Sequence, residues 1–296
     1  MYPDFLGIGA QKSGTTWLHA MLSQHRDIWL PHLKELHYFD RKFPVNESDG
    51  FLNPTPRQGV AGNHLRRRIQ RFSLDKLRER LQIHRLSDLG WELKFLFGAW
   101  DDAWYSSLFE NHAGRMTGEI TPAYSCLGPT AISHIYNLMP HAKLILLLRD
   151  PIDRAWSHAK MDLATTRRRN PRSVTEDDYI AHFNSRASRL RGDYLRTINC
   201  WLEKYPEDQL FIGFFDQIES EPEILLTRIL DFLGVNSSAD AIHADPRSAV
   251  NAGQKASIPQ RLHQHLASLY IDDLQILAQR YEHHPTRWLD KCKNAL

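Results

Sequence analysis

Lys12 stands in a short polar segment whose residue types suit the binding of a phosphate or sulfate group. The apolar run Phe5–Ala10 precedes this segment and predicts a buried strand, and apolar residues at helical spacing follow it from Trp17. A strand, a polar turn and a helix N-terminus present unpaired backbone N–H groups and the positive end of the helix dipole to an anion. Gly14 permits a close backbone approach, and the ammonium group of Lys12 adds a full positive charge. The segment therefore predicts an anion-binding loop between a strand and a helix.

The order of residues in this loop separates it from the Walker A loop of nucleotide kinases. That motif, G-x-x-x-x-G-K-[ST], places a glycine directly before the lysine. Here Gln11 precedes the lysine, and the glycine comes after Ser13. Thr15 and Thr16 then supply two hydroxyl donors at the start of the expected helix. The loop is thus an anion site of another kind, with a plain turn between strand and helix as the structural alternative.

Arg149 and Ser157 form a second pair of residues suited to a phosphate. Arg149 ends the continuous apolar run that begins at Lys143, and such a run is typical of a parallel strand covered on both faces. Ligands of open α/β sheets bind at the carboxyl edge of the strands, and Ser157 falls in the helix expected after that edge. A guanidinium binds a phosphate through two hydrogen bonds, and a hydroxyl adds another. The alternative is an arginine that pairs with Asp150 or Asp153 beside a solvated serine.

Four segments together resemble the sulfotransferases that use 3′-phosphoadenosine-5′-phosphosulfate (PAPS). They are KSGTTW at 12–17, KELHYF at 34–39, GEITPAY at 118–124 and LLLRDPIDRAWS at 146–157. The set is most similar to the heparan-sulfate and bacterial carbohydrate-type branch of that family. The resemblance implies one domain over residues 1–296, with a P-loop-kinase-like α/β fold and a central parallel sheet flanked by helices. It also implies transfer of a sulfuryl group from PAPS to a hydroxyl, with 3′-phosphoadenosine 5′-phosphate (PAP) as product and no metal.

The resemblance assigns the nucleotide contacts residue by residue. The implied PAPS-binding residues are Lys12, Ser13, Gly14, Thr15, Thr16, Trp17, Arg149, Ser157, Gly253 and Lys255. Lys12 would stabilise the charge that develops on the oxygen bridging sulfur and phosphorus. Trp17 would stack on the adenine, or else belong to the core beneath the first helix. Gly253 and Lys255 match only loosely the late loop that closes over the 3′-phosphate in this family.

A hydroxyl acceptor also needs a base to remove its proton. In the heparan-sulfate 3-O-type branch this base is a glutamate in a motif similar to KELHYF, and Glu35 is the matching residue. If the segment is extended, Glu35 and His37 point to the same side, so both are catalytic candidates. The structural alternative is a surface pair of Lys34 with Glu35 and a structural His37. Glu119 is a weaker candidate for the base.

The composition of the chain limits its compartments and partners. The formal net charge of +2 over 296 residues does not indicate binding to nucleic acid or to a membrane. Three widely spaced cysteines do not suggest a disulfide framework, and no signal segment or membrane-spanning apolar run is evident. The 16 histidines are scattered and show no familiar metal-ligand spacing. These features predict a cytoplasmic protein, and they leave its oligomeric state open.

Strands alternate with helices along the chain, which predicts a doubly wound α/β fold. The expected strands are Phe5–Ala10, Ile28–Leu30, Arg115–Ile120, Lys143–Arg149 and Gln209–Phe215. The helices expected after the first one are Leu74–Leu86, Asp101–His112, Pro129–Met139, one from about Ile152, Glu176–Leu190, Asp193–Tyr205, Pro222–Leu233, Pro259–Tyr270 and Asp272–Arg280.

Two other functions remain open from the residues alone. A P-loop kinase that uses ATP would share the position of the loop, but the order of the loop residues and the second phosphate pair argue against it. A non-catalytic protein that senses PAP would keep Lys12, Thr16, Arg149 and Ser157 and would need no base at Glu35. The acceptor is equally open, because small-molecule, glycan and carrier-bound hydroxyls all fit.

Overall fold

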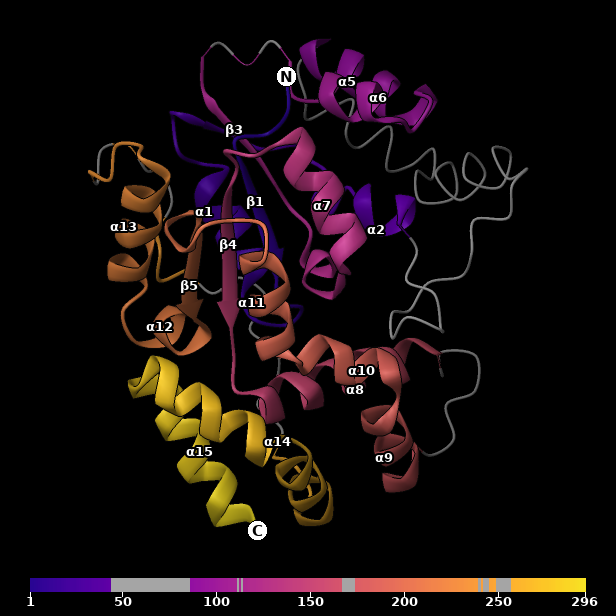
Figure 1. The fold of residues 1–296 in the computed structure, drawn as a ribbon, viewed down its shortest axis with the longest axis vertical. Helices are drawn as coiled ribbons and strands as arrows, with labels where there is room; N and C mark the ends of the chain where they lie inside the picture. Colours follow the sequence, from indigo (N-terminus) through magenta and orange to yellow (C-terminus); the bar gives the residue numbers. More distant parts are fainter. Residues whose placement is uncertain are drawn as a thin grey trace.

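A five-stranded parallel sheet forms the centre of the fold (Figure 1). The computed structural model describes residues 1–43, 86–110, 112, 114–166, 174–238, 241, 245–248 and 257–296. The strands are β1 (Phe5–Gly9), β2 (Ile28–Trp29), β3 (Met116–Ile120), β4 (Lys143–Leu148) and β5 (Leu210–Phe214). Their order is β2–β3–β1–β4–β5, and every pair runs parallel, which confirms the predicted fold class. Phe5 of the central strand lies opposite Gly118 on one side and Lys143 on the other.

Helices cover both faces of this sheet. They are α1 (Thr15–Leu22), α2 (Phe39–Lys42), α5 (Leu86–Phe97), α6 (Asp102–Ser107), η2 (Pro122–Cys126), α7 (Pro129–Leu138), α8 (Pro151–Thr166), α9 (Glu176–Asn184), α10 (Arg186–Gly192), α11 (Tyr194–Leu202), η4 (Glu207–Gln209), α12 (Phe215–Ser220), α13 (Pro222–Leu233), α14 (Gln260–Tyr281) and α15 (His283–Ala295).

The side chains of β4 show how one strand serves both layers. Leu144, Leu146 and Leu148 are fully buried in a core cluster that includes residues of α7 and α11. Ile145 and Leu147 are fully buried in a second cluster with α1 and α13. Successive side chains of a strand point to opposite faces, so a run without polar residues packs against helices on both sides. The uninterrupted apolar sequence of this strand therefore fixes it in the middle of a three-layer fold.

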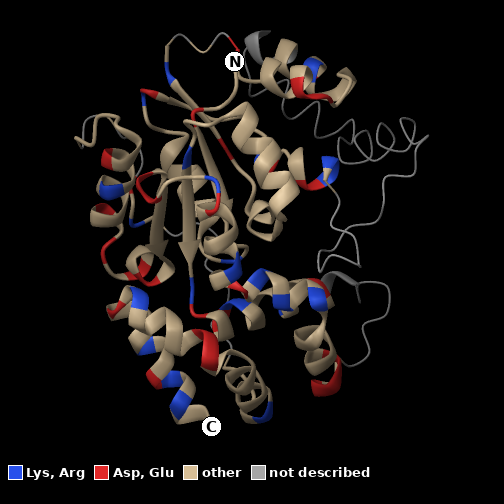
Figure 2. Ribbon diagram, viewed as in Figure 1, with Lys and Arg blue, Asp and Glu red and all other residues tan. Residues whose placement is uncertain are grey.

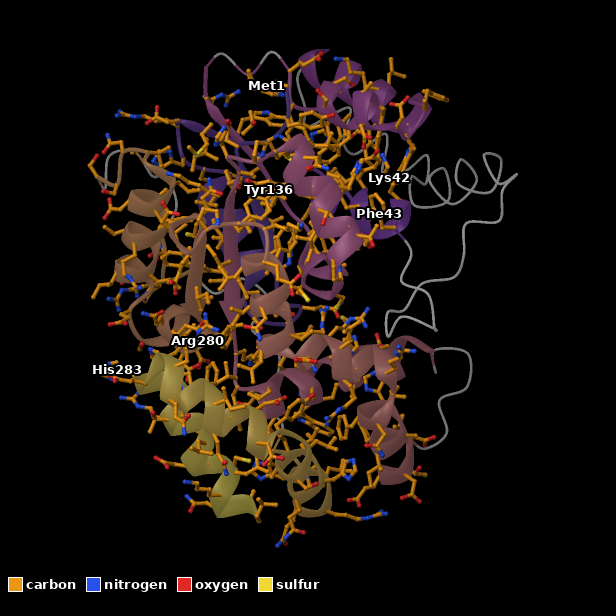
Figure 3. All side chains as sticks on the ribbon, viewed as in Figure 1. Met1, Lys42, Phe43, Tyr136, Arg280 and His283 are labelled. Carbon is orange, nitrogen blue, oxygen red and sulfur yellow. The ribbon has the colours of Figure 1, made fainter. Side chains whose placement is uncertain are left out.

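The carboxyl ends of the strands face the part of the molecule that holds α8, α14 and α15 (Figure 1). Arg280 and His283, which mark the junction of α14 with α15, lie at this same end (Figure 3). Lys42 and Phe43 lie at the end of α2 beside α7, where Phe43 and His134 have ring centroids 4.9 Å apart (Figure 3). The loops that follow β1 and β4 therefore open toward one edge of the sheet.

Charged side chains lie mainly on the helices, while the strands are almost entirely uncharged (Figure 2). Positive and negative residues are interspersed along α14 and α15 (Figure 2). Among the described helices, none is both long and apolar enough to cross a lipid bilayer.

Several predicted boundaries are wrong for identifiable reasons. The two helices expected at Pro259–Tyr270 and Asp272–Arg280 form the single helix α14, because no glycine or proline interrupts it. The helix expected at Glu176–Leu190 divides at Ser185, whose extended backbone ends α9 and whose hydroxyl caps α10. The helix expected at Asp101–His112 ends at Ser107.

The terminal helix α15 was not predicted. Proline at position 285 and a largely polar sequence mask its helical pattern. Its buried residues are Pro285, Trp288, Leu289 and Cys292, at a spacing that places them on one helix face. The helix expected at Leu74–Leu86 lies outside the described residues except for its last position, where α5 begins.

Candidate active site

The predicted anion loop joins β1 to α1 at the carboxyl edge of the sheet. Gly14 caps the helix in the left-handed conformation, with φ of 89°. The backbone angle favours glycine, and a Cβ at this position would lie 2.3 Å from Ile218 Cδ1 of α12, so that side chain would have to move. Ser13 is fully buried beneath the turn, and Thr15 is also buried. The turn is therefore held in place by its contact with α12 as well as by the strand before it.

Lys12 lies among other cations in this loop. Its backbone is left-handed, with φ of 72°, and its carbonyl accepts a 3.1 Å hydrogen bond from Arg149 Nη1. Its ammonium group lies 3.8 Å from Met161 Sδ of α8. Burial, followed by the positive charges of Arg149, Lys160 and Lys34, lowers the pKa of Lys12. An anion bound among these groups would relieve their mutual repulsion.

Arg149 lies directly after β4, as predicted. Its guanidinium carbon is 4.3 Å from the centroid of the Phe215 ring, and its carbonyl accepts a 2.9 Å hydrogen bond from the Tyr194 hydroxyl. Within the part of the chain that the structure describes, Arg149 forms no ion pair with Asp150. That carboxylate instead accepts a 3.0 Å hydrogen bond from the backbone N–H of Ile152. The charge of the arginine is therefore available to an anionic ligand.

Ser157 lies half-buried in the second turn of α8, the helix that begins after Asp150. Arg149 and Ser157 thus come from the strand end and the following helix that the sequence predicted. Their contact with one shared phosphate remains a prediction.

Lys34 is a site residue that the sequence reasoning did not assign. Its ammonium group donates hydrogen bonds to Thr16 Oγ1 at 3.0 Å and to Thr15 Oγ1 at 3.3 Å. The same group lies 3.3 Å from Glu35 Oε1. The expected pair of Lys34 with Glu35 exists, but it joins the anion loop rather than the open surface. Its position directly before Glu35 was the available signal.

Glu35, His37 and Asp40 form a connected chain of side chains. His37 Nε2 lies 3.4 Å from Glu35 Oε2, and His37 Nδ1 lies 2.8 Å from Asp40 Oδ2. The segment is not extended at these positions, because Glu35 and His37 have φ of 64° and 56°. The left-handed backbone bends the chain twice and returns the carboxylate to the imidazole. Asp40, in the first turn of α2, is a second residue that the sequence reasoning missed.

Glu35 and His37 have pKa values shifted in opposite directions. Burial lowers the pKa of His37, but its hydrogen bonds to Asp40 and Glu35 outweigh burial and raise the pKa to about 9. Burial raises the pKa of Glu35, but contacts with His37 and Lys34 outweigh it and leave the pKa below its usual range. At neutral pH, Glu35 is therefore a carboxylate and His37 an imidazolium.

Glu119 occupies a different environment from Glu35. It is 2% exposed in the core, where its carboxylate accepts hydrogen bonds from the hydroxyls of Tyr105, Thr121 and Tyr124. Burial, the largest influence, raises the pKa of Glu119 to about 7. A carboxylate that already has three hydroxyl partners and almost no exposure is poorly placed to meet an acceptor, which argues against Glu119 as the base.

Trp17 lies in the core on α1, with 3% of its surface exposed. Its indole Nε1 donates a 2.9 Å hydrogen bond to the carbonyl of Pro246. This burial favours the structural reading of Trp17, and stacking on adenine stays a prediction. The predicted contacts of Gly253 and Lys255 lie outside the described residues.

One group of histidines lies closer together than the sequence suggested. Among the described residues, His158, Asp162 and His182 bring potential metal-ligand atoms within 4.8 Å of one another. His158 and Asp162 are one turn apart on α8, and His182 comes from α9. The fold thus brings two of the scattered histidines close to one carboxylate, at a place outside the loop that holds Lys12.

Two curated human proteins are similar to parts of this chain. Human heparan sulfate glucosamine 3-O-sulfotransferase 6 is 29% identical over 140 residues, which are 45% of this chain and 40% of that protein. Human bifunctional heparan sulfate N-deacetylase/N-sulfotransferase 2 is 24% identical over 244 residues, which are 79% of this chain and 22% of that protein. The chain therefore spans less than half the length of these curated relatives.

A solved structure extends the likeness to nearly the whole chain. The crystal structure of a sulfotransferase from Alicyclobacillus acidocaldarius matches with a TM-score of 0.67 and 23% identity. The match covers 97% of this chain and 99% of that protein, and it shows that the fold is shared. A family model described as "Sulfotransferase family" matches residues 3–240, which include Lys12, Glu35 and Arg149. The chain thus belongs to the sulfotransferase family.

Proposed function

We propose that this protein transfers the sulfuryl group of PAPS to a hydroxyl of its acceptor. The family implies PAPS as co-substrate. One observation supports the proposal most strongly: Lys34 Nζ lies 3.0 Å from Thr16 Oγ1 and 3.3 Å from Glu35 Oε1. The anion loop and the candidate base therefore meet at one ammonium group. A donor group bound in the loop would lie close to a carboxylate able to accept a proton.

The proposed reaction is an in-line displacement at sulfur. Glu35 takes the proton of the acceptor hydroxyl while the acceptor oxygen forms its bond to sulfur. The bond between sulfur and the bridging oxygen breaks, and the electron pair leaves with PAP. Lys12 stabilises the negative charge that grows on this oxygen, an interaction stronger in the transition state than in the ground state.

Glu35 is a better base than His37 in this environment. A general base must be unprotonated at the working pH, and Glu35 meets that condition because its pKa is lowered. His37 keeps its proton up to about pH 9, because its pKa is raised to about that value. We assign His37 to orient the Glu35 carboxylate, and Asp40 to hold the imidazolium in place.

The nucleotide is proposed to bind across the carboxyl edge of the sheet. Ser13, Gly14, Thr15 and Thr16 hold the 5′-phosphosulfate with Lys12, since the helix N-terminus favours an anion there. A second set binds the 3′-phosphate and the adenine, and its members are Arg149, Ser157, Trp17, Gly253 and Lys255. The transfer step itself uses no metal in this proposal, because Lys12 supplies the charge at the leaving oxygen.

A glycan hydroxyl is the acceptor class that we propose first. The two human relatives carry heparan sulfate in their names, one as a glucosamine 3-O-sulfotransferase. Small-molecule and carrier-bound hydroxyls are the competing classes. We further propose a single sulfotransferase domain and a cytoplasmic location, which the odd number of widely spaced cysteines supports.

Calorimetry with PAP, ATP and ADP tests the nucleotide. We expect PAP to bind more tightly than either adenosine phosphate, since only PAP carries a 3′-phosphate for Arg149. Tighter binding of ATP would support a P-loop kinase and overturn the proposal. Transfer from labelled PAPS to a panel of glycans, phenols and carrier-bound hydroxyls then tests the activity. PAP binding with no transfer to any class would support a non-catalytic PAP sensor.

A further inference from the structure

A second cluster of reactive side chains lies between α8 and α9, outside the proposed transfer site. His158 and Asp162 are one turn apart on α8, and His182 projects from α9. His182 Nε2 lies 3.1 Å from Asp162 Oδ2, and His158 Nε2 lies 3.4 Å from the same oxygen. His158 is buried, while the Asp162 side chain is 48% exposed. Two nitrogens thus converge on one carboxylate oxygen at the end of a solvent-accessible side chain.

These separations fit the ligand spacing of a small metal ion. Zinc binds histidine nitrogen and carboxylate oxygen at about 2.0–2.2 Å in a tetrahedron, so its ligand atoms lie roughly 3.3 Å apart. The two contacts of Asp162, at 3.1 and 3.4 Å, match this edge length. The longer contact exceeds the usual 2.7–3.2 Å of an N–H···O hydrogen bond, so hydrogen bonding alone explains it poorly. The third separation, between the potential ligand atoms of His158 and His182, is at most 4.8 Å.

The donor types select the class of metal. Two imidazoles and one carboxylate suit zinc and neighbouring divalent transition metals, whereas calcium and magnesium prefer sites made of oxygen. The exposure of Asp162 leaves room for water as a fourth ligand. We propose that His158, Asp162 and His182 bind one zinc ion.

The position of this site suggests what the ion does. Trp156 and Tyr179, with ring centroids 4.8 Å apart, already pack α8 against α9, and the ion would add a bond between the same helices. Ser157 precedes His158 directly on α8, and Asp162 acts electrostatically on Lys12. A bound ion would therefore fix the helix that borders the donor loop. Its role is structural, and the transfer step does not pass through it.

Zinc titration of the metal-stripped chain tests the proposal. We expect one ion per chain, and we expect His182→Ala to weaken the affinity by more than the roughly 10-fold cost of losing a supporting partner of a metal ligand. His265→Ala is the matched control. His265 also contacts α9, through a 2.9 Å hydrogen bond with Asn184 Oδ1, but it lies outside the cluster. This control should bind zinc like the unmodified chain.

A cobalt spectrum of the unmodified chain gives a readout that does not depend on any variant folding. Four-coordinate Co²⁺ absorbs visible light much more strongly than the six-coordinate ion in water, so a stoichiometric strong band supports the site. Zinc should also raise the melting temperature of the unmodified chain and of His265→Ala. No stoichiometric zinc or cobalt binding, or equal zinc affinity in His182→Ala, would overturn the proposal.

Discussion

The donor loop, residues 10–17, and the acceptor segment, residues 34–40, lie next to each other but are held in position by different kinds of contact. The donor loop lies between a buried strand and a helix, and Gly14 is its cap. The acceptor segment precedes the short helix α2, with left-handed residues at Glu35 and His37. Side-chain contacts, rather than backbone ladders, bring its charged groups together.

This difference shows what holds the side chains of each half of the site in position. Regular elements fix the donor loop, so a substitution of the Lys12 side chain should affect charge and binding more than position. The acceptor segment depends on a chain of contacts from Lys34 through Glu35 and His37 to Asp40. Removing one member should therefore disturb the others, and the pH dependence of the reaction should report it.

Among the nucleotide-binding residues, the largest expected effect is at Lys12. Lys12→Ala should lower kcat by about 10²–10³-fold, the usual cost of removing one group that stabilises transition-state charge. PAP affinity should fall by less, because the effect is greatest in the transition state. Steady-state kinetics with calorimetry measure both quantities, and Lys204→Ala, on an exposed side chain, is the control. An equal loss in kcat and in PAP affinity would make Lys12 a binding residue only.

Arg149 should govern binding of the 3′-phosphate. Arg149→Ala should weaken PAP by roughly 10–100-fold, since hydrogen bonds to charged groups contribute about 1.5–3 kcal/mol. Adenosine 5′-phosphate, which lacks the 3′-phosphate, should lose much less. Arg228→Ala is a matched control, because Arg228 also lies over an aromatic ring, 5.5 Å from the centroid of Phe211. The same loss for both nucleotides would contradict the assignment.

Asp40 should set the alkaline limit of the reaction. His37 holds its proton below a pKa of about 9 and loses it as the pH rises through that value. Asp40→Asn removes the first carboxylate that raises this pKa, so the alkaline decline should begin at lower pH, with a smaller change in the maximal rate. A pH–rate profile of both proteins measures the shift. Identical alkaline limits would mean that His37 does not control the rate.

Proton uptake on PAP binding should be the smallest effect. Burial and neighbouring cations lower the pKa of Lys12 in the free protein, and an anionic ligand should raise it again. At mildly alkaline pH, binding should therefore take up a fraction of a proton. Calorimetry in buffers of different ionisation enthalpy measures this fraction, and Lys12→Ala should reduce it. Proton release on binding would contradict the sign of this linkage.

The sequence predicted the donor half of the molecule well. The start of β1, the strand β4 and the helix α13 all follow from apolar runs and turn residues, which depend on local sequence. The positions of Arg149 and Ser157 followed from the same logic. These features are local or follow from the rule that ligands meet the carboxyl edge of a parallel sheet.

The acceptor half could not be predicted to the same depth. Glu35 and His37 adopt left-handed backbone angles although neither is a glycine or an asparagine, the residue types that favour such angles. The residue types therefore did not predict these angles. The hydrogen bond from Lys34 to Thr16 joins residues 18 positions apart in the chain. Only the folded chain brings such partners together.

The central claim is that Glu35 of the acceptor segment acts as the base on a sulfuryl donor bound in the donor loop. Single-turnover transfer by Glu35→Gln tests this claim most directly. Labelled PAPS is bound in excess enzyme, an acceptor identified in the screen is added, and transfer is followed by rapid quench. The account predicts a rate lower by about 10²–10⁴-fold with PAP affinity little changed, because only the base is lost. Glu203→Gln, on an exposed side chain, should transfer at the unmodified rate. An unchanged single-turnover rate for Glu35→Gln would contradict the account.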